Sequence, residues 1–143
     1  MPAFPASLVT PEHVLLQEDV TAVMLRTDVG DATFLAGHTP LIGALVPGLV
    51  RFEREDGTTE RTAVHGGFVH VTRQGVTVLA PVAERMGDID VDRARRALET
   101  AERAVAEIAG RTSGAGDDGP ALELVLAEAA VRRARVRLEV AEA

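Results

Sequence analysis

The chain has 143 residues, of which 46% are hydrophobic, and its formal net charge is -7 at pH 7. It contains no cysteine, which excludes disulfides and thiolate chemistry, and all of its basic residues are arginine, which excludes a Schiff-base lysine or a phosphate-loop lysine. The acidic balance and the absence of Trp and Tyr argue against a nucleic-acid-binding surface.

The apolar stretches are short. Residues 41–50, among the longest, are interrupted by Gly43, Pro47 and Gly48 and fall below the about 20 apolar residues that cross a bilayer. The first nine residues have neither a basic segment nor an apolar core of the kind found in signal peptides. We therefore expect a cytoplasmic chain that reaches a membrane only through a partner.

Residues 6–86 have the pattern of short β-strands. Valines recur at every second position at 69 and 71 and again at 76 and 78, and residues 50–53 alternate apolar and polar side chains. Turn dipeptides such as Asp56-Gly57 and Pro47-Gly48 separate these segments. The region predicts an antiparallel β-sandwich or flattened barrel of roughly eight to ten strands, within a first domain of residues 1–87.

After Gly87 the apolar period becomes helical, which predicts a second domain over residues 88–143. Asp90 stands at the N-cap of a first helix and Gly110 at its end. Residues 111–119 read as a loop, and Pro120 opens a second helix. One apolar stripe is predicted on the first helix and two on the second; they comprise Ala94, Leu98, Ala101, Val105 and Ile108, then Leu122, Leu126, Ala129, Val136 and Val140, and beside these Leu124, Val131 and Leu138.

The short connection predicts an antiparallel helical hairpin in which the apolar stripes of the two helices face each other. Its Ala-rich seam buries little apolar surface, so the packing free energy that it supplies is small. Two interpretations stay open: a hairpin that exchanges packing partners, and a tail that stays docked permanently.

No constellation of an enzyme is visible. Ser7 and Ser113 lack the strand-turn-helix context of an acyl-transfer nucleophile. His38, His65 and His70 show no metal-ligand spacing, so no metal site is expected. The acidic residues 84, 88, 90 and 92 are explained by favourable charge at a helix N-terminus.

Several segments, in order, resemble one family. Residues 8–12 and 20–26 are similar to its opening hairpin, residues 37–41 and 47–48 to its central loop and turn, and residues 66–68 and 76–80 to the rest of its sandwich. Ile89-Asp90-x-x-Arg93-Ala94 is similar to the start of its helical domain. The family is the epsilon subunit of the bacterial F-type ATP synthase.

The resemblance implies a ten-stranded β-sandwich followed by a two-helix hairpin, and a subunit that catalyses nothing itself. It implies a rotor subunit of the central stalk whose sandwich binds the gamma subunit and rests on the c-ring. The hairpin would lie on the sandwich or extend along gamma toward the alpha and beta subunits, where it restrains ATP hydrolysis. The subunit would be peripheral to the membrane, at the cytoplasmic face of the bacterial inner membrane.

The resemblance also implies three sets of contact residues. The c-ring contact would involve Asp28, Gly30, Asp31 and His38, although Ala32-Thr33 replaces the apolar residue and glycine that are usual in the family. Regulatory ATP, with no other cofactor, would be held by Asp90 and Arg93, with Glu84 and one of Arg132, Arg133 and Arg135. The inhibitory contact with alpha and beta would use Arg132, Arg133, Arg135 and Arg137.

Each set has a simpler explanation. A helix cap and a solvated arginine account equally well for Asp90 and Arg93, and a solvated helix face accounts for the C-terminal arginines. An alternative function for the whole chain is a free-standing β-sandwich that binds a ligand and self-associates through its helical tail. Copurification with gamma would favour the rotor subunit, and self-association of residues 88–143 would favour the alternative.

Overall fold

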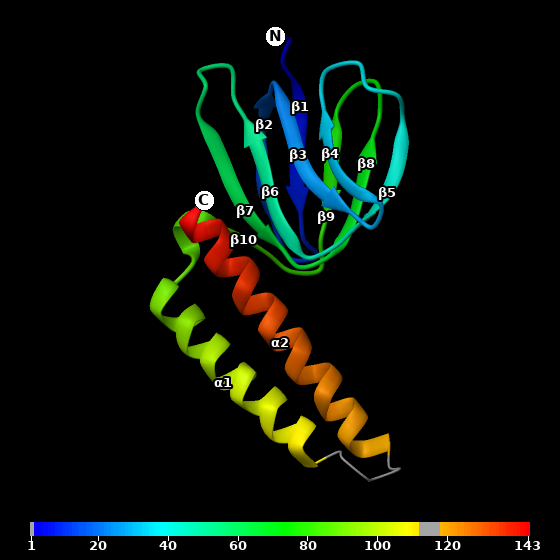
Figure 1. Ribbon diagram of the computed structural model, residues 1–143. Helices are drawn as coiled ribbons and strands as arrows, with labels where there is room; N and C mark the ends of the chain where they lie inside the picture. The colour runs from blue at the N-terminus through cyan, green and yellow to red at the C-terminus, as the bar shows by residue number, and fades with distance from the viewer. Residues whose placement is uncertain (1, 112–117) are drawn as a thin grey trace.

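A computed structural model describes residues 2–111 and 118–143 and shows a β-sandwich from which a two-helix hairpin projects (Figure 1). The strands are β1 Phe4–Val9, β2 Val14–Val20, β3 Ala22–Thr27, β4 Gly30–Phe34, β5 Leu41–Leu45, β6 Gly48–Glu53, β7 Thr59–Val64, β8 Gly67–Val71, β9 Val76–Leu79 and β10 Ala83–Arg85. A short 3-10 helix, Met86–Asp88, leads into α1 Val91–Arg111 and α2 Asp118–Glu142. The predicted sandwich with a helical hairpin is confirmed.

The strands form two layers. One layer contains β4, β3, β6, β7 and β10, and the other contains β5, β8, β9, β1 and β2. A single pair, Thr27 with Leu45, joins the layers between β3 and β5. Among the described strands, β1 and β9 pair in parallel, with Ala6 opposite Val76, whereas the other pairs are antiparallel as expected.

The core lies between the layers and follows the alternation seen in the sequence. Val69 pairs with Val78 and Val71 with Val76, and all four side chains are at most 3% exposed. Phe52 of β6 is fully buried against them in the same cluster. Burial of such β-branched and aromatic side chains on one face of each strand is the main source of stability of the sandwich.

Helix α1 begins where the sequence predicts. The Asp90 carboxylate accepts a hydrogen bond from the backbone N–H of Arg93 at 3.0 Å, which satisfies a donor that the first helical turn leaves free. The helix ends at Arg111, one residue beyond the expected stop at Gly110. Of the predicted loop 111–119, residues 112–117 lie outside the described residues, and α2 already includes 118 and 119.

The prediction that one stripe of α2 faces α1 is wrong in part. Val136 and Val140 pack against Ala63 of β7, and Leu122 and Leu126 are each 62% exposed. Val131, from the second stripe, is buried and lines a groove together with residues of α1. The sandwich covers only the C-terminal part of the first stripe, so its N-terminal part continues into solvent.

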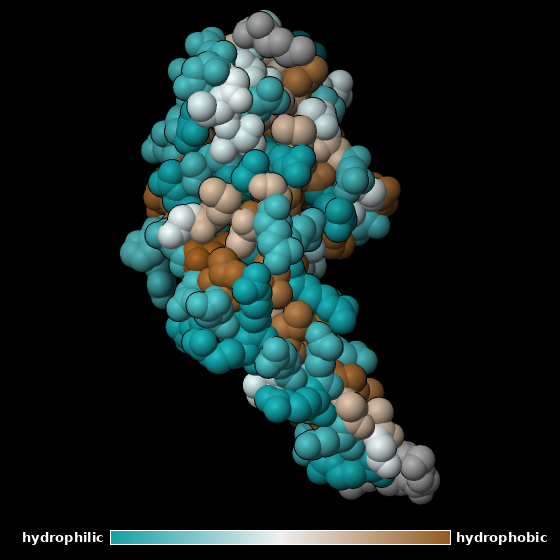
Figure 2. All heavy atoms as spheres, turned by 60° about the vertical axis from the view of Figure 1, so that its left-hand side comes forward, coloured by the Kyte–Doolittle hydropathy of each residue, from teal (hydrophilic) through white to brown (hydrophobic). Residues whose placement is uncertain are grey.

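This continuation is visible on the surface. Figure 2 shows hydrophobic atoms among hydrophilic ones along the arm that projects beyond the sandwich. No helix within residues 2–111 and 118–143 is long and apolar enough to cross a membrane.

Candidate functional site

The hairpin touches the sandwich through the C-terminal end of α2. The apolar contact consists of Val136 and Val140 against Ala63 of β7, with Leu49 and Ile89 at its edge. The remainder of α2 extends away from β6 and β7 (Figure 1). The hairpin is therefore docked by a small contact near one end.

A charged cluster lies beside this apolar contact. Glu84 of β10 accepts hydrogen bonds at Oε1 from Arg137 Nε of α2 at 2.7 Å and from His65 Nε2, in the β7–β8 turn, at 3.1 Å. Burial acts to raise the pKa of Glu84, but the hydrogen bonds from Arg137 and His65 outweigh burial, so the pKa lies below its ordinary value of 4.5. We call Glu84, His65 and Arg137 the docking triad.

The β7–β8 turn that carries His65 requires glycine. Gly66 and Gly67 both have positive φ, at 87° and 122°. A Cβ on Gly67 would also overlap the backbone of Leu79 in β9. The two glycines therefore permit a tight turn, and this turn holds His65 against β10.

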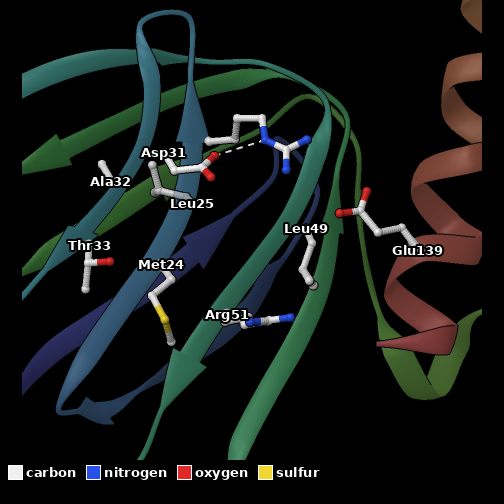
Figure 3. Close-up of a pocket in the computed structure, with 9 residues that line it drawn as sticks. Met24, Leu25, Asp31, Ala32, Thr33, Leu49, Arg51 and Glu139 are labelled. Atoms are coloured by element: carbon white, nitrogen blue, oxygen red, sulfur yellow. Dashed lines mark hydrogen bonds and ion pairs between the residues drawn. The ribbon is translucent and has the colours of Figure 1, made fainter.

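A cavity of about 280 Å³ lies on the outer face of β3, β4 and β6, next to α2 (Figure 3). Leu49, Arg51 and Glu139 line it, and an ion pair of 3.0 Å joins Arg26 to Asp31 at its rim. The hydrogen bond with Asp31 raises the pKa of Arg26 above its ordinary value, and the more distant charge of Glu139 contributes less. Glu139 of α2 therefore lines the same cavity as the strands, and its charge acts on Arg26 across it.

The structure divides the predicted c-ring residues between two places. Asp28, Gly30 and Asp31 lie at the β3–β4 turn, where Thr27 pairs with Gly30. His38 follows the other end of β4, a strand of 5 residues, and its ring packs edge-on against Phe34 with centroids 4.8 Å apart. The predicted c-ring residues therefore lie at the two ends of β4.

The predicted nucleotide residues are likewise not gathered into one pocket. Arg93 lines an Ala-rich groove of about 490 Å³ between the helices, whereas Arg132 and Arg135 line another groove, of about 470 Å³. Asp90 caps α1, and Glu84 belongs to the docking triad. Arg133 is exposed and lines neither groove.

The four arginines of the predicted inhibitory contact differ in exposure. Arg132, Arg133 and Arg135 are exposed, whereas the side chain of Arg137 is 28% exposed and paired with Glu84. In the docked hairpin Arg137 is therefore occupied by a contact within the chain.

An apolar outer surface on β5, β8 and β9 escaped the sequence analysis. Phe68 pairs directly with Leu79, and Ile42 lies on the same face of β5 as Ala44, which is opposite Phe68. Phe68 is 56%, Leu79 45% and Ile42 74% exposed. A hollow of about 570 Å³ adjoins Phe68 and Leu79 and extends to Val9. The signal was available, since inward valines at 69 and 71 place Phe68 outward.

This apolar face, defined by Ile42, Phe68 and Leu79, lies on the layer of the sandwich that does not carry the hairpin. Exposed apolar patches of this kind mark protein interfaces more often than a scattered surface residue does. The sandwich thus has two distinct outer surfaces, one apolar and open and one covered in part by α2.

Comparisons with known proteins identify the family. The model of the ATP synthase Delta/Epsilon chain beta-sandwich domain matches residues 3–86, and that of its long alpha-helix domain matches residues 88–142. The ATP synthase epsilon chains of Brucella suis and Brucella canis are each 43% identical to this chain over 106 residues, which cover 69% of this chain and 78% of theirs.

Solved structures agree. One similar chain comes from a structure of the Euglena gracilis mitochondrial ATP synthase, OSCP/F1/c-ring in rotational state 1. It superposes with a TM-score of 0.79 at 26% identity, and the superposition covers 99% of this chain and 82% of that one. A chain of the Tetrahymena thermophila mitochondrial ATP synthase shares the fold, with a TM-score of 0.58 at 12% identity and 96% of each chain covered. The chain belongs to the family of ATP synthase epsilon subunits, which are non-catalytic subunits of that complex.

Proposed function

We propose that this chain is a rotor subunit in the central stalk of a proton-translocating F-type ATP synthase. Residues 1–87 bind the gamma subunit and rest on the c-ring, so that rotation of the c-ring is coupled to the catalytic head. Residues 88–143 form a regulatory hairpin that restrains ATP hydrolysis by contact with the alpha and beta subunits. The chain is peripheral to the cytoplasmic face of the bacterial inner membrane and is held there by the complex.

The apolar face on β5, β8 and β9 carries this proposal. Its three large side chains are exposed in the isolated chain, and a subunit that must transmit torque needs a stable contact of this apolar kind. It lies away from the hairpin, so that a partner bound there leaves α2 free to move. The Euglena relative, from a structure that contains F1 and the c-ring, supports the same assignment.

The remaining contacts follow from where the predicted residues lie. We assign the c-ring contact to the β3–β4 turn, with Asp28, Gly30 and Asp31, and to the separate loop at His38. We assign the inhibitory contact to Arg132, Arg133 and Arg135, which are exposed, and to Arg137 once it leaves Glu84.

The experiment that tests the first role is copurification with gamma. Phe68→Asp should abolish binding, because it places a charge at the centre of the apolar face. Gln74→Asp, at an exposed position in the β8–β9 turn, is the control and should leave binding intact. Unimpaired binding by the Phe68 variant, or self-association of the chain without gamma affinity, would favour a free-standing ligand-binding module instead.

The regulatory role is tested by deletion. A chain that ends at residue 87 should fold and assemble, because the sandwich core contains no residue of the helices. ATP hydrolysis by the reconstituted complex should then rise relative to the complex with the full chain. Unchanged hydrolysis would contradict the inhibitory role while leaving the gamma contact standing.

A further inference from the structure

His65 occupies an unusual position for a histidine in this chain. Its side chain is only 5% exposed and lies in the β7–β8 turn, between Glu84 of β10 and the C-terminal end of α2. The same Glu84 oxygen that accepts its hydrogen bond also accepts that of Arg137. One carboxylate therefore connects a buried imidazole of the sandwich with a cation of the hairpin.

The hydrogen bond fixes the tautomer of His65. An ionised carboxylate can only accept, so the imidazole proton must be on Nε2, which donates to Glu84. Nδ1 is then a bare nitrogen, and it is buried with no hydrogen-bond partner among the described residues. A proton added there would create a buried N–H, and a second positive charge beside Arg137, with no acceptor among those residues.

We propose that His65 is a proton-sensitive latch for the hairpin, in which the neutral imidazole permits docking of α2 and protonation at Nδ1 releases it. The docked contact is small enough for one proton to matter. Among the described residues it consists of Val136 and Val140 against Ala63, with Leu49 and Ile89 at the edge, and of one ion pair between α2 and the sandwich. The hairpin is anchored to β10 by only the short segment that contains Gly87, so release requires no unfolding of the sandwich.

The charges around His65 determine whether its pKa is higher in the docked or in the released state. Burial is the main cause that lowers the pKa of His65 below its ordinary value of 6.5, and the charges of Arg137 and Arg133 on α2 lower it further. Glu84 on β10 opposes them. When α2 leaves, both arginines leave with it and the imidazole gains access to water, whereas Glu84 stays. The pKa of His65 is therefore higher in the released state than in the docked state.

The released state thus binds more protons than the docked state. By linkage, docking is fully favoured above the pKa of the released histidine and weakens as the pH falls through that value. Because one proton is involved, the docking constant falls by at most about tenfold per pH unit, until the docked form is protonated as well. Protonation of Glu84 weakens docking in the same direction, but at lower pH, since its pKa lies below 4.5.

The chain has no cysteine, so two labels can be introduced without removing any. We would place a fluorescent donor and acceptor at Glu55→Cys, in the loop between β6 and β7, and Glu107→Cys on α1, both of which are exposed. Energy transfer in the full chain is then followed from about pH 8 to pH 5.5. The series is repeated with Val140→Ala, which weakens the apolar contact so that both states are populated.

The expected result is a loss of docking toward pH 5.5 that disappears in His65→Gln, whose amide can donate to Glu84 but does not titrate. His70→Gln is the matched control, since His70 is exposed on the outer face of β8 and should leave the response intact. A second readout is the nitrogen NMR of His65, which should show the Nε2–H tautomer at pH 8.

Three results would overturn the proposal. They are constant energy transfer across this range in both the unmodified and the Val140→Ala chains, a pH response that survives in His65→Gln, and an Nδ1–H tautomer at pH 8. Each measurement uses the isolated chain, so a failure here is distinct from a failure of the chain to bind gamma.

Discussion

Val140→Ala should loosen the hairpin without weakening the sandwich. Val140 is fully buried at the contact with Ala63 of β7. The substitution removes two methyl groups at about 0.8 kcal/mol each, and the small cavity left behind adds to this loss. The docked state should lose about 2 kcal/mol, which reduces the docking constant about 30-fold.

Energy transfer between labels on the sandwich and on α1 measures docking, and thermal unfolding of the same samples measures the stability of the sandwich. We expect the released fraction to increase while the midpoint of sandwich unfolding changes little, because Val140 is not part of the sandwich core. The two measurements together separate the docking contact from the core.

Val125→Ala is the matched control, since it removes the same atoms from the same helix. Val125 is 57% exposed, so the change in docking should stay below about 0.5 kcal/mol. Equal effects of the two substitutions would refute the reasoning, because the loss would then not depend on burial of the side chain against the sandwich. A large drop in sandwich stability with Val140→Ala would refute it as well.

Three further outcomes are expected. The hydrogen bond from Arg85 lowers the pKa of Glu60 against the effect of burial. Ionised Glu60 therefore stabilises the sandwich above its ordinary pKa of 4.5, and this contribution is lost as the pH falls through the lowered pKa. Glu60→Gln should flatten the acid side of a plot of midpoint temperature against pH. Gly67→Ala should lower the unfolding free energy by more than about 2 kcal/mol, because the φ of Gly67 is 122° and an added Cβ would overlap β9. Gly57→Ala, at a position with open space around it, should lower it by about 1 kcal/mol. Equal losses in chemical denaturation would contradict this difference. Calorimetric titration with ATP should show no binding by the docked chain, because Arg93 lines a different groove from Arg132 and Arg135; saturable binding that Arg93→Ala removes would contradict this.

Local patterns in the sequence were sufficient for the elements themselves. Alternating valines at 69, 71, 76 and 78 predict strands with one buried face, and all four are buried. Asp90 predicts the start of α1, because a carboxylate at that position satisfies free backbone donors whatever the rest of the chain does. Strand alternation and helix caps depend only on residues a few positions apart, so the sequence is sufficient to predict them.

The family, too, could be recognised from the order of short motifs, but the candidate contacts could not be located. The sequence cannot show that β4 separates His38 from the β3–β4 turn, or that Arg93 and Arg132 line different grooves, because both depend on how elements are packed in space. Residues close in the chain, or shared by one motif, need not share one surface.

The sequence by itself determined the two periods, the strands and helices that follow from them, and the helix cap, since each rests on contacts within a few residues. The tertiary structure alone decided that β1 pairs in parallel with β9, that the apolar stripe of α2 is divided between the sandwich and solvent, and that Glu84 joins His65 to Arg137. The physical reason is separation along the chain: Arg137 lies 53 residues from Glu84, and only the position of α2 against β6 and β7 brings them within hydrogen-bonding distance.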